Sequence, residues 1–237
     1  MWNKLTLAGS ARFFFSLMLA WGLGSAWAGA EEWQLDKDTQ GIQLYTRQMP
    51  GHPLKDFRGV MQVQAPLRQV AAMVADVPAM PEWFFLLREA RFLKDDRVED
   101  SHIYLAMKGI WPVSPRDAVA HVRVRQDPET LAIHIQLDSE DGVFPPQDGY
   151  VRIPTMHSTC KLTPISANHT QVEIIGSADP GGWVPLALAN FLVTAVPEQS
   201  LKKMREFIAK PEYRDLNRIF AKNPKLRELA QRMRFPE

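Results

Sequence analysis

The chain has 237 residues, of which 46% are apolar and 23% are charged, and this suits one globular domain with a sizeable core. The formal charge of +1 gives no overall signal for nucleic-acid binding. The single cysteine, Cys160, excludes an internal disulfide, so the fold must be stable without one.

Residues 1–30 have the pattern of a secretory signal peptide. Lys4 and Arg12 form a positive n-region, an apolar stretch follows, and Ala26-Trp27-Ala28 is a small-x-small cleavage site. The pattern predicts a periplasmic or secreted protein, whose mature chain keeps 26 basic side chains against 27 acidic ones. An uncleaved inner-membrane anchor is the alternative, because the uncharged stretch after Arg12 is just long enough to span a bilayer.

The first part of the exported chain predicts a short helix, two strands and a second helix. Residues 31–38 are predicted as helix, and residues 41–47 and 57–64 show the alternation of half-buried strands. Pro66 suits the first turn of a helix that continues to Asp76.

A short helix over residues 82–87 is expected between prolines. Trp83, Phe84, Leu86 and Leu87 make it apolar on almost every side. Either all four belong to the core, or two or three of them line a pocket.

Residues 103–125 predict two strands joined by a connection that prolines interrupt. Leu105 and Met107 lie on the apolar face of the first strand. On the second strand, Ala118 and Ala120 share a face with two valines. By parity Arg116 lies on that same face.

An arginine on an apolar strand face needs an explanation, because an isolated buried charge is very costly. Arg116 either reaches solvent or forms an internal ion pair, or it contacts a ligand in a space that the small alanines leave open.

Further strands are expected over residues 131–137, 150–153, 157–163 and 171–177. Their short spacing implies one antiparallel sheet. In the first of them, Ile133 points inward and His134 outward.

A long helix is predicted from Pro185 to Lys210. Its first half, residues 183–196, is apolar on nearly every face but too short to span a bilayer. It must therefore be covered by protein on one side and by something apolar on another. A second helix over Tyr213–Arg234 carries seven basic residues, which form either a solvated face or a surface for an anionic membrane or partner.

Motifs for catalysis, metal binding or phosphate binding are absent from the sequence. The six histidines lack a ligand spacing such as HExxH, and Gly181-Gly182 lacks the P-loop lysine. Cys160 has no neighbouring residue that would mark it as reactive. The sequence therefore predicts no catalytic residue, no metal ligand and no cofactor.

Three segments together resemble the START lipid-transfer domain family: WPVSPRDAV at 111–119, GYVRI at 149–153 and DPGGWVPLALAN at 179–190. The resemblance implies an α+β helix-grip fold over residues 31–210, in which a curved antiparallel sheet and a long C-terminal helix enclose a hydrophobic cavity. Residues 211–237 would be a basic helical extension.

The resemblance also implies that the protein binds, and transfers without catalysis, a lipid or another hydrophobic small molecule. The expected cavity residues are Trp83, Phe84, Leu105, Met107, Trp111, Arg116, Ala118, Ala120, Ile133, Tyr150, Arg152, Leu188, Phe191 and Thr194. A monomer is expected, with transient contact between the basic helix and a membrane surface.

One departure from the family pattern bears on the ligand. Sterol-carrying members typically have an acid and a base in the cavity, at positions that align with Ile103 and Val122 here. This disfavours a sterol. The alternatives to lipid transfer are an enzyme of the cyclase or hydrolase type on the same fold, and a partner-binding module whose core is filled.

Overall fold

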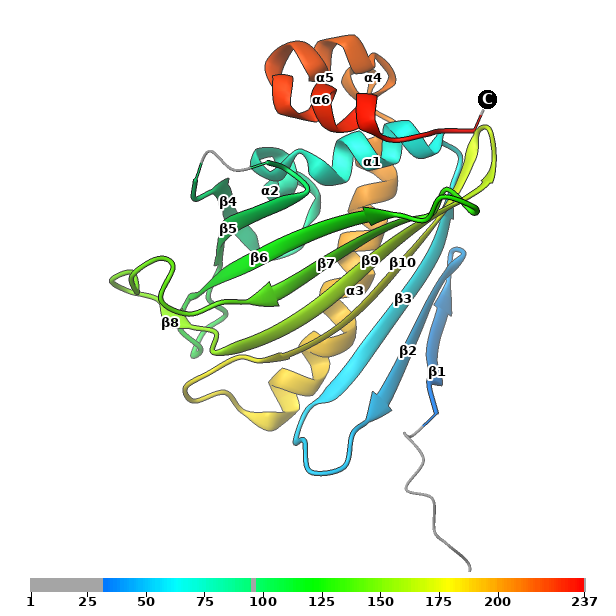
Figure 1. The fold of residues 1–237 in the computed structure, drawn as a ribbon. Coiled ribbons are helices and arrows are strands. Elements are labelled where there is room, and N and C mark those ends of the chain that lie inside the picture. Colours follow the sequence, from blue (N-terminus) through cyan, green and yellow to red (C-terminus); the bar gives the residue numbers. More distant parts are fainter. Residues whose placement is uncertain (1–31, 95–96, 237) are drawn as a thin grey trace, which may run out of the picture. The chain divides into compact units, whose positions relative to one another are not determined.

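The computed structural model describes residues 32–94 and 97–236. Within them, ten strands form one sheet in the order β1-β2-β3-β10-β9-β7-β6-β5-β4, with β8 beside β6 (Figure 1). The strands are β1 Gln34–Thr39, β2 Ile42–Gln48, β3 Lys55–Val63, β4 Leu87–Phe92, β5 Asp100–Met107, β6 Arg116–Gln126, β7 Ile133–Ser139, β8 Val151–Arg152, β9 Thr155–Ser166 and β10 His169–Asp179. All pairs are antiparallel except β6 with β8.

The long helix α3 crosses one face of this sheet, which we call the inner face; the opposite side is the outer face (Figure 1). The helical elements are α1 Leu67–Ala75, η1 Val77–Ala79, α2 Met80–Trp83, α3 Leu186–Ile208, α4 Pro211–Arg214, α5 Leu216–Lys222 and α6 Pro224–Arg232. This arrangement confirms the predicted α+β fold, with an antiparallel sheet packed against a long C-terminal helix.

The second half of α3 forms the tightest contact with the inner face. Leu201, Met204 and Phe207 are almost completely buried there. A Cβ atom on Gly59 of β3 would lie 2.8 Å from Leu201 Cδ1, so any larger residue there would force the buried Leu201 side chain to shift.

Two of the predicted helices near the N-terminus are wrong. Gln34–Thr39 is not helical and pairs with β2 as an edge strand, because pairing outweighs a weak local helix propensity. The helix expected at 82–87 is α2, which ends at Trp83, and Phe84 is extended. Leu86 then adopts a φ of 66°, a left-handed conformation that a helix cannot continue through.

The single basic helix expected over Tyr213–Arg234 is three short helices. Asp215 and Asn223 break it, since each has non-helical backbone angles at the N-cap position of the next helix, and the Asp215 carboxylate accepts a hydrogen bond from the Asn217 N–H. Phe220 and Leu226 are buried in the same apolar cluster as α1, so this segment packs on the sheet domain (Figure 1).

The predicted signal peptide, residues 1–30, lies outside the described part of the chain, which begins at residue 32. Among the described residues, no helix is both long and apolar enough to cross a membrane.

Candidate functional site

Two cavities lie between α3, α2 and the inner face of the sheet. The larger has a volume of about 250 Å³ and extends along the first half of α3. The smaller has a volume of about 120 Å³ and lies toward α1 and α6. Met80 and Phe84 are shared by both linings, so these side chains from the α2 region stand where the two cavities meet.

The lining of both cavities is predominantly apolar. In the larger cavity, the strands contribute Leu87, Leu105 and Met107. In the smaller, they contribute Ile133, Ile135 and Val122. Apolar ligands gain free energy in proportion to the area that such walls remove from water.

Trp83 supplies an unusual polar atom at the wall of the smaller cavity. Its side chain is buried, and its indole Nε1 has no hydrogen-bond acceptor among the described residues. Buried Trp N–H groups normally find a partner, so this donor stands out as unsatisfied beside the cavity.

The helix face toward the larger cavity differs from the expected one. Ala189, Leu192, Val193 and Val196 line it, whereas Leu188, Phe191 and Thr194 are absent from the lining. Phe191 is 63% exposed.

The spacing of residues in the sequence does indicate which face of α3 lines the cavity. Counting back from the buried Leu201 in steps of four gives Pro197, Val193 and Ala189, all of which line the cavity. The all-round apolar character of residues 183–196 obscured this helical phase.

The expected strand and loop residues separate into two groups. Trp83, Phe84, Leu105, Met107 and Ile133 line the cavities. Ala118 and Ala120 are fully buried on the inner face but lie outside both linings.

Arg116 does lie on the inner side, and its guanidinium is occupied by backbone carbonyls. Nη2 donates to Gly181 O at 3.3 Å and Trp183 O at 3.2 Å, Nε to Pro180 O at 3.5 Å, and Nη1 to Ser114 O. The side chain therefore ties the β5–β6 connection to the segment before α3, and four of its five N–H groups are used.

Arg152 and Tyr150 lie on the outer face, away from the cavities. Arg152 makes two hydrogen bonds of 2.9 Å to the buried carboxylate of Asp117, and this pairing raises the pKa of the arginine. Tyr104 packs nearby, and burial together with the Asp117 charge raises its pKa to about 12. This group holds the 140–154 segment on the sheet.

Exposed aromatic and aliphatic side chains flank the loops that Arg116 ties together. Trp111 is 92% exposed in the β5–β6 connection, and Trp183 is 69% exposed before α3. Leu186 and Phe191 add exposed apolar surface on the first turns of α3. Trp183, Leu186 and Phe191 lie close together in sequence, and such a group of exposed apolar side chains marks a surface for apolar contact.

A third hollow has a larger volume, about 920 Å³, and a different character. It lies between β2, β3, β10 and the end of α3, and polar side chains such as Gln62, Gln171 and Arg205 line it. An apolar ligand would leave these groups without water, so this cleft does not suit one.

The START domain family matches residues 25–213 of the sequence. The chain belongs to this family. An uncharacterised protein of Pseudomonas aeruginosa is 31% identical over 176 residues, which cover 74% of this chain and 86% of that protein. The crystal structure of a STAR-related lipid transfer protein from Xanthomonas axonopodis is also 31% identical, with a TM-score of 0.69, and covers 75% of this chain and 99% of that one.

Human STARD10 has the same fold at only 15% identity. Its TM-score is 0.72, and the match covers 85% of this chain and 82% of that one. The START assignment thus agrees with the sheet, the long C-terminal helix and the apolar cavities between them.

Proposed function

We propose that this START domain binds a lipid or another apolar molecule in the two cavities beneath α3 and transfers it without chemical change. The observation that carries the proposal is the hollow, apolar space between the first half of α3 and the inner face. A core that served only stability would be close-packed at this point.

The cavity volumes favour a ligand with a single chain. They lie at or below the lower end of small-molecule pockets, which is about 300 Å³. Each methylene that leaves water contributes about 0.8 kcal/mol, so one acyl chain supplies enough driving force for binding. The unpaired Trp83 Nε1 favours a ligand with an acceptor, such as a carboxyl or ester oxygen.

Several groups on the walls argue against catalysis. Cys160 is the only thiol of the chain, and burial raises its pKa to about 12, so the nucleophilic thiolate is disfavoured. The wall residue His157 directs its Nδ1 to Asp138, 2.5 Å away. Ser200 Oγ accepts a hydrogen bond from the Phe85 N–H.

Exchange would take place at a membrane surface, through the exposed apolar groups Trp183 and Phe191 on and before α3. The predicted signal peptide directs the protein to the periplasm, where a lipid must cross an aqueous space. The basic residues of α5 and α6 would add attraction to an anionic surface.

Filling the larger cavity tests the binding site directly. Ala189 lines the cavity, while Ala187 on the same helix is exposed and absent from the lining. Ala189→Trp should lower the affinity for a fluorescent fatty acid at least tenfold, because the indole occupies the ligand's space. Ala187→Trp should bind as the parent protein does.

Both variants should be assayed in solution by fluorescence titration, with circular dichroism to verify folding. Mass spectrometry of the purified protein under native conditions should show a co-purified apolar molecule. Equal affinity in the two variants would reject the cavity as the binding site, and conversion of a bound ester would establish an enzyme.

A further inference from the structure

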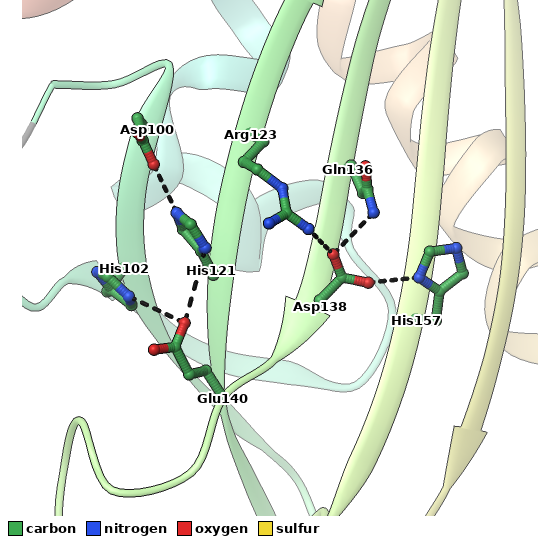
Figure 2. A network of polar contacts seen from close by, with 8 residues as sticks. All are labelled: Asp100, His102, His121, Arg123, Gln136, Asp138, Glu140 and His157. Carbon is green, nitrogen blue, oxygen red and sulfur yellow. Dashed lines mark hydrogen bonds and ion pairs between the residues drawn. The ribbon is translucent and has the colours of Figure 1, made fainter.

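The outer face carries a cluster of histidines and carboxylates that the lipid-binding function does not use (Figure 2). His102 on β5 and His121 on β6 are direct partners in the antiparallel register. Their rings stack with centroids 4.7 Å apart and planes 10° apart. Glu140, just after β7, is fixed by its N–H, which donates to Val119 O at 3.0 Å.

One oxygen of Glu140 faces both imidazoles. Its Oε2 lies 3.2 Å from His102 Nε2 and 3.6 Å from His121 Nδ1. The three ligand atoms all lie within 4.8 Å of one another. Tetrahedral zinc with bonds of 2.0–2.1 Å holds its ligand atoms about 3.3 Å apart, so two of the three spacings already fit.

Asp100 contacts the His121 ring at the nitrogen that does not face Glu140. Its Oδ1 lies 2.5 Å from His121 Nε2, so this nitrogen donates its proton to the carboxylate. The other nitrogen, Nδ1, then faces the Glu140 carboxylate, on the side where a metal ion would be bound. A carboxylate behind a histidine is the usual way to orient an imidazole for a metal ion.

We propose that His102, His121 and Glu140 bind a divalent transition-metal ion of the zinc class on the outer face, with Asp100 as the partner that orients His121. Two imidazoles and one carboxylate suit Zn²⁺ and leave a fourth position for water. The stacked rings must turn about χ2 to direct both lone pairs at one point, and this torsion is broad for histidine.

The neighbouring cluster on the same face lacks these properties. Asp138 receives His157, but it also receives Arg123 and Gln136, as Figure 2 shows. The guanidinium already neutralises this carboxylate, so no further cation is needed there. The difference singles out the Glu140 cluster.

A metal ion at this site would link β5, β6 and the start of the 140–154 segment. That segment supplies Phe144 and Tyr150, which cover Tyr104 and Val119 on the outer face. The site lies on the opposite side of the sheet from the cavities, so it is independent of the proposed lipid binding.

The test is calorimetric titration of the purified, tag-free protein with ZnCl₂, together with thermal unfolding. We expect one Zn²⁺ per chain and a raised melting temperature. His102→Ala, His121→Ala and Glu140→Gln should each abolish both effects. Asp100→Asn should weaken binding about 10–100-fold, the range for loss of an outer partner.

His134→Ala is the matched control, since this exposed histidine lies on the outer face of β7 outside the cluster. It should leave zinc binding unchanged. Co²⁺ should give the visible absorption of tetrahedral coordination in the parent protein and lose it in His121→Ala. Zinc binding that persists equally in the three ligand variants, or absence of one-to-one binding by the folded parent protein, would overturn the proposal.

Discussion

The two halves of α3 cover the same inner face in different ways. From Pro197 onward, seven residues are buried, among them Leu201, Met204 and Phe207. From Leu186 to Val196, Ala189 alone is buried, although nearly all of these residues are apolar. One half fills the space over the sheet, and the other leaves the larger cavity.

This difference separates stability from binding along one helix. The part of α3 from Pro197 onward, the filled half, is closely packed on the sheet. The part from Leu186 to Val196, the hollow half, keeps apolar surface that is not buried against the sheet. Hydrophobic character alone would rank the halves the other way, because the first half is apolar on nearly every face and the second half carries charged residues such as Lys202 and Lys203. The difference lies in which side chains contact the sheet and how completely they fill the space above it.

Truncation of one leucine in each half gives the largest expected contrast. Leu201→Ala removes a fully buried side chain next to Gly59 and should lower the free energy of unfolding by about 2–5 kcal/mol. Leu192→Ala borders space that is already empty, so about 1 kcal/mol or less is expected.

Urea denaturation followed by circular dichroism measures both values. Leu192→Ala should in addition alter affinity for a fatty-acid probe, which Leu201→Ala should change less. Equal losses of stability would show that α3 is packed uniformly, and the distinction between the halves would fail.

Replacement of Arg116 tests how the hollow half is held. Arg116→Met releases the carbonyls of residues 180, 181 and 183 and should lower the free energy of unfolding by about 1.5–3 kcal/mol, the range for hydrogen bonds to a charged group. Affinities for a fatty acid and for its methyl ester should fall alike. A loss confined to the acid would instead place the guanidinium at a ligand carboxylate.

The sequence predicted this side chain's position but not its partners. Strand parity correctly placed Arg116 on the inner side of the sheet, because alternation is a local property. Three of its four acceptors lie more than 60 residues further along the chain, in a loop whose path depends on tertiary structure. Parity left open whether Arg116 reaches solvent, forms an internal ion pair or contacts a ligand.

Dependence on tertiary structure also explains why the helix face was wrongly predicted and the histidine cluster was missed. Leu188 and Leu192 are equally apolar in sequence, so residue type does not reveal which one lines the cavity, and the helical phase has to be carried back from the buried Leu201. His102 and His121 become neighbours through the register of β5 and β6, which motif spacing does not encode. The α+β class, by contrast, followed from strand and helix periodicity along with the START resemblance.

The exposed end of the hollow half should control transfer more than affinity. Trp183→Ser and Phe191→Ser together remove apolar surface that lies outside the cavity lining. We expect the rate of fatty-acid transfer between vesicles to fall about tenfold, which corresponds to about 1.4 kcal/mol, with an unchanged dissociation constant in solution. Stopped-flow fluorescence measures the rate, and Leu35→Ser, which removes an exposed leucine from β1, is the control. A parallel fall in affinity would assign these residues to binding.

The smallest expected effect on the free energy of unfolding comes from replacing Glu198, which lies at the start of the filled half. Its carboxylate bonds to Lys202 Nζ at 2.6 Å and to Lys37 Nζ of β1 at 2.8 Å, and these contacts lower its pKa from the ordinary 4.5. A lowered pKa in the folded state stabilises the protein above the unfolded pKa, and this contribution is lost as the pH falls through the folded pKa.

Glu198→Gln should therefore cost about 1 kcal/mol at pH 7, a modest value because both lysines are partly exposed and solvent screens the pair. Below the lowered pKa the carboxyl is protonated in both folded and unfolded chains, so the stabilities of variant and parent should converge. Urea midpoints measured from pH 7 down to acid pH give the two curves. A constant gap at every pH would mean that Glu198 acts through packing, and the charge contacts would then contribute nothing to holding α3 against β1.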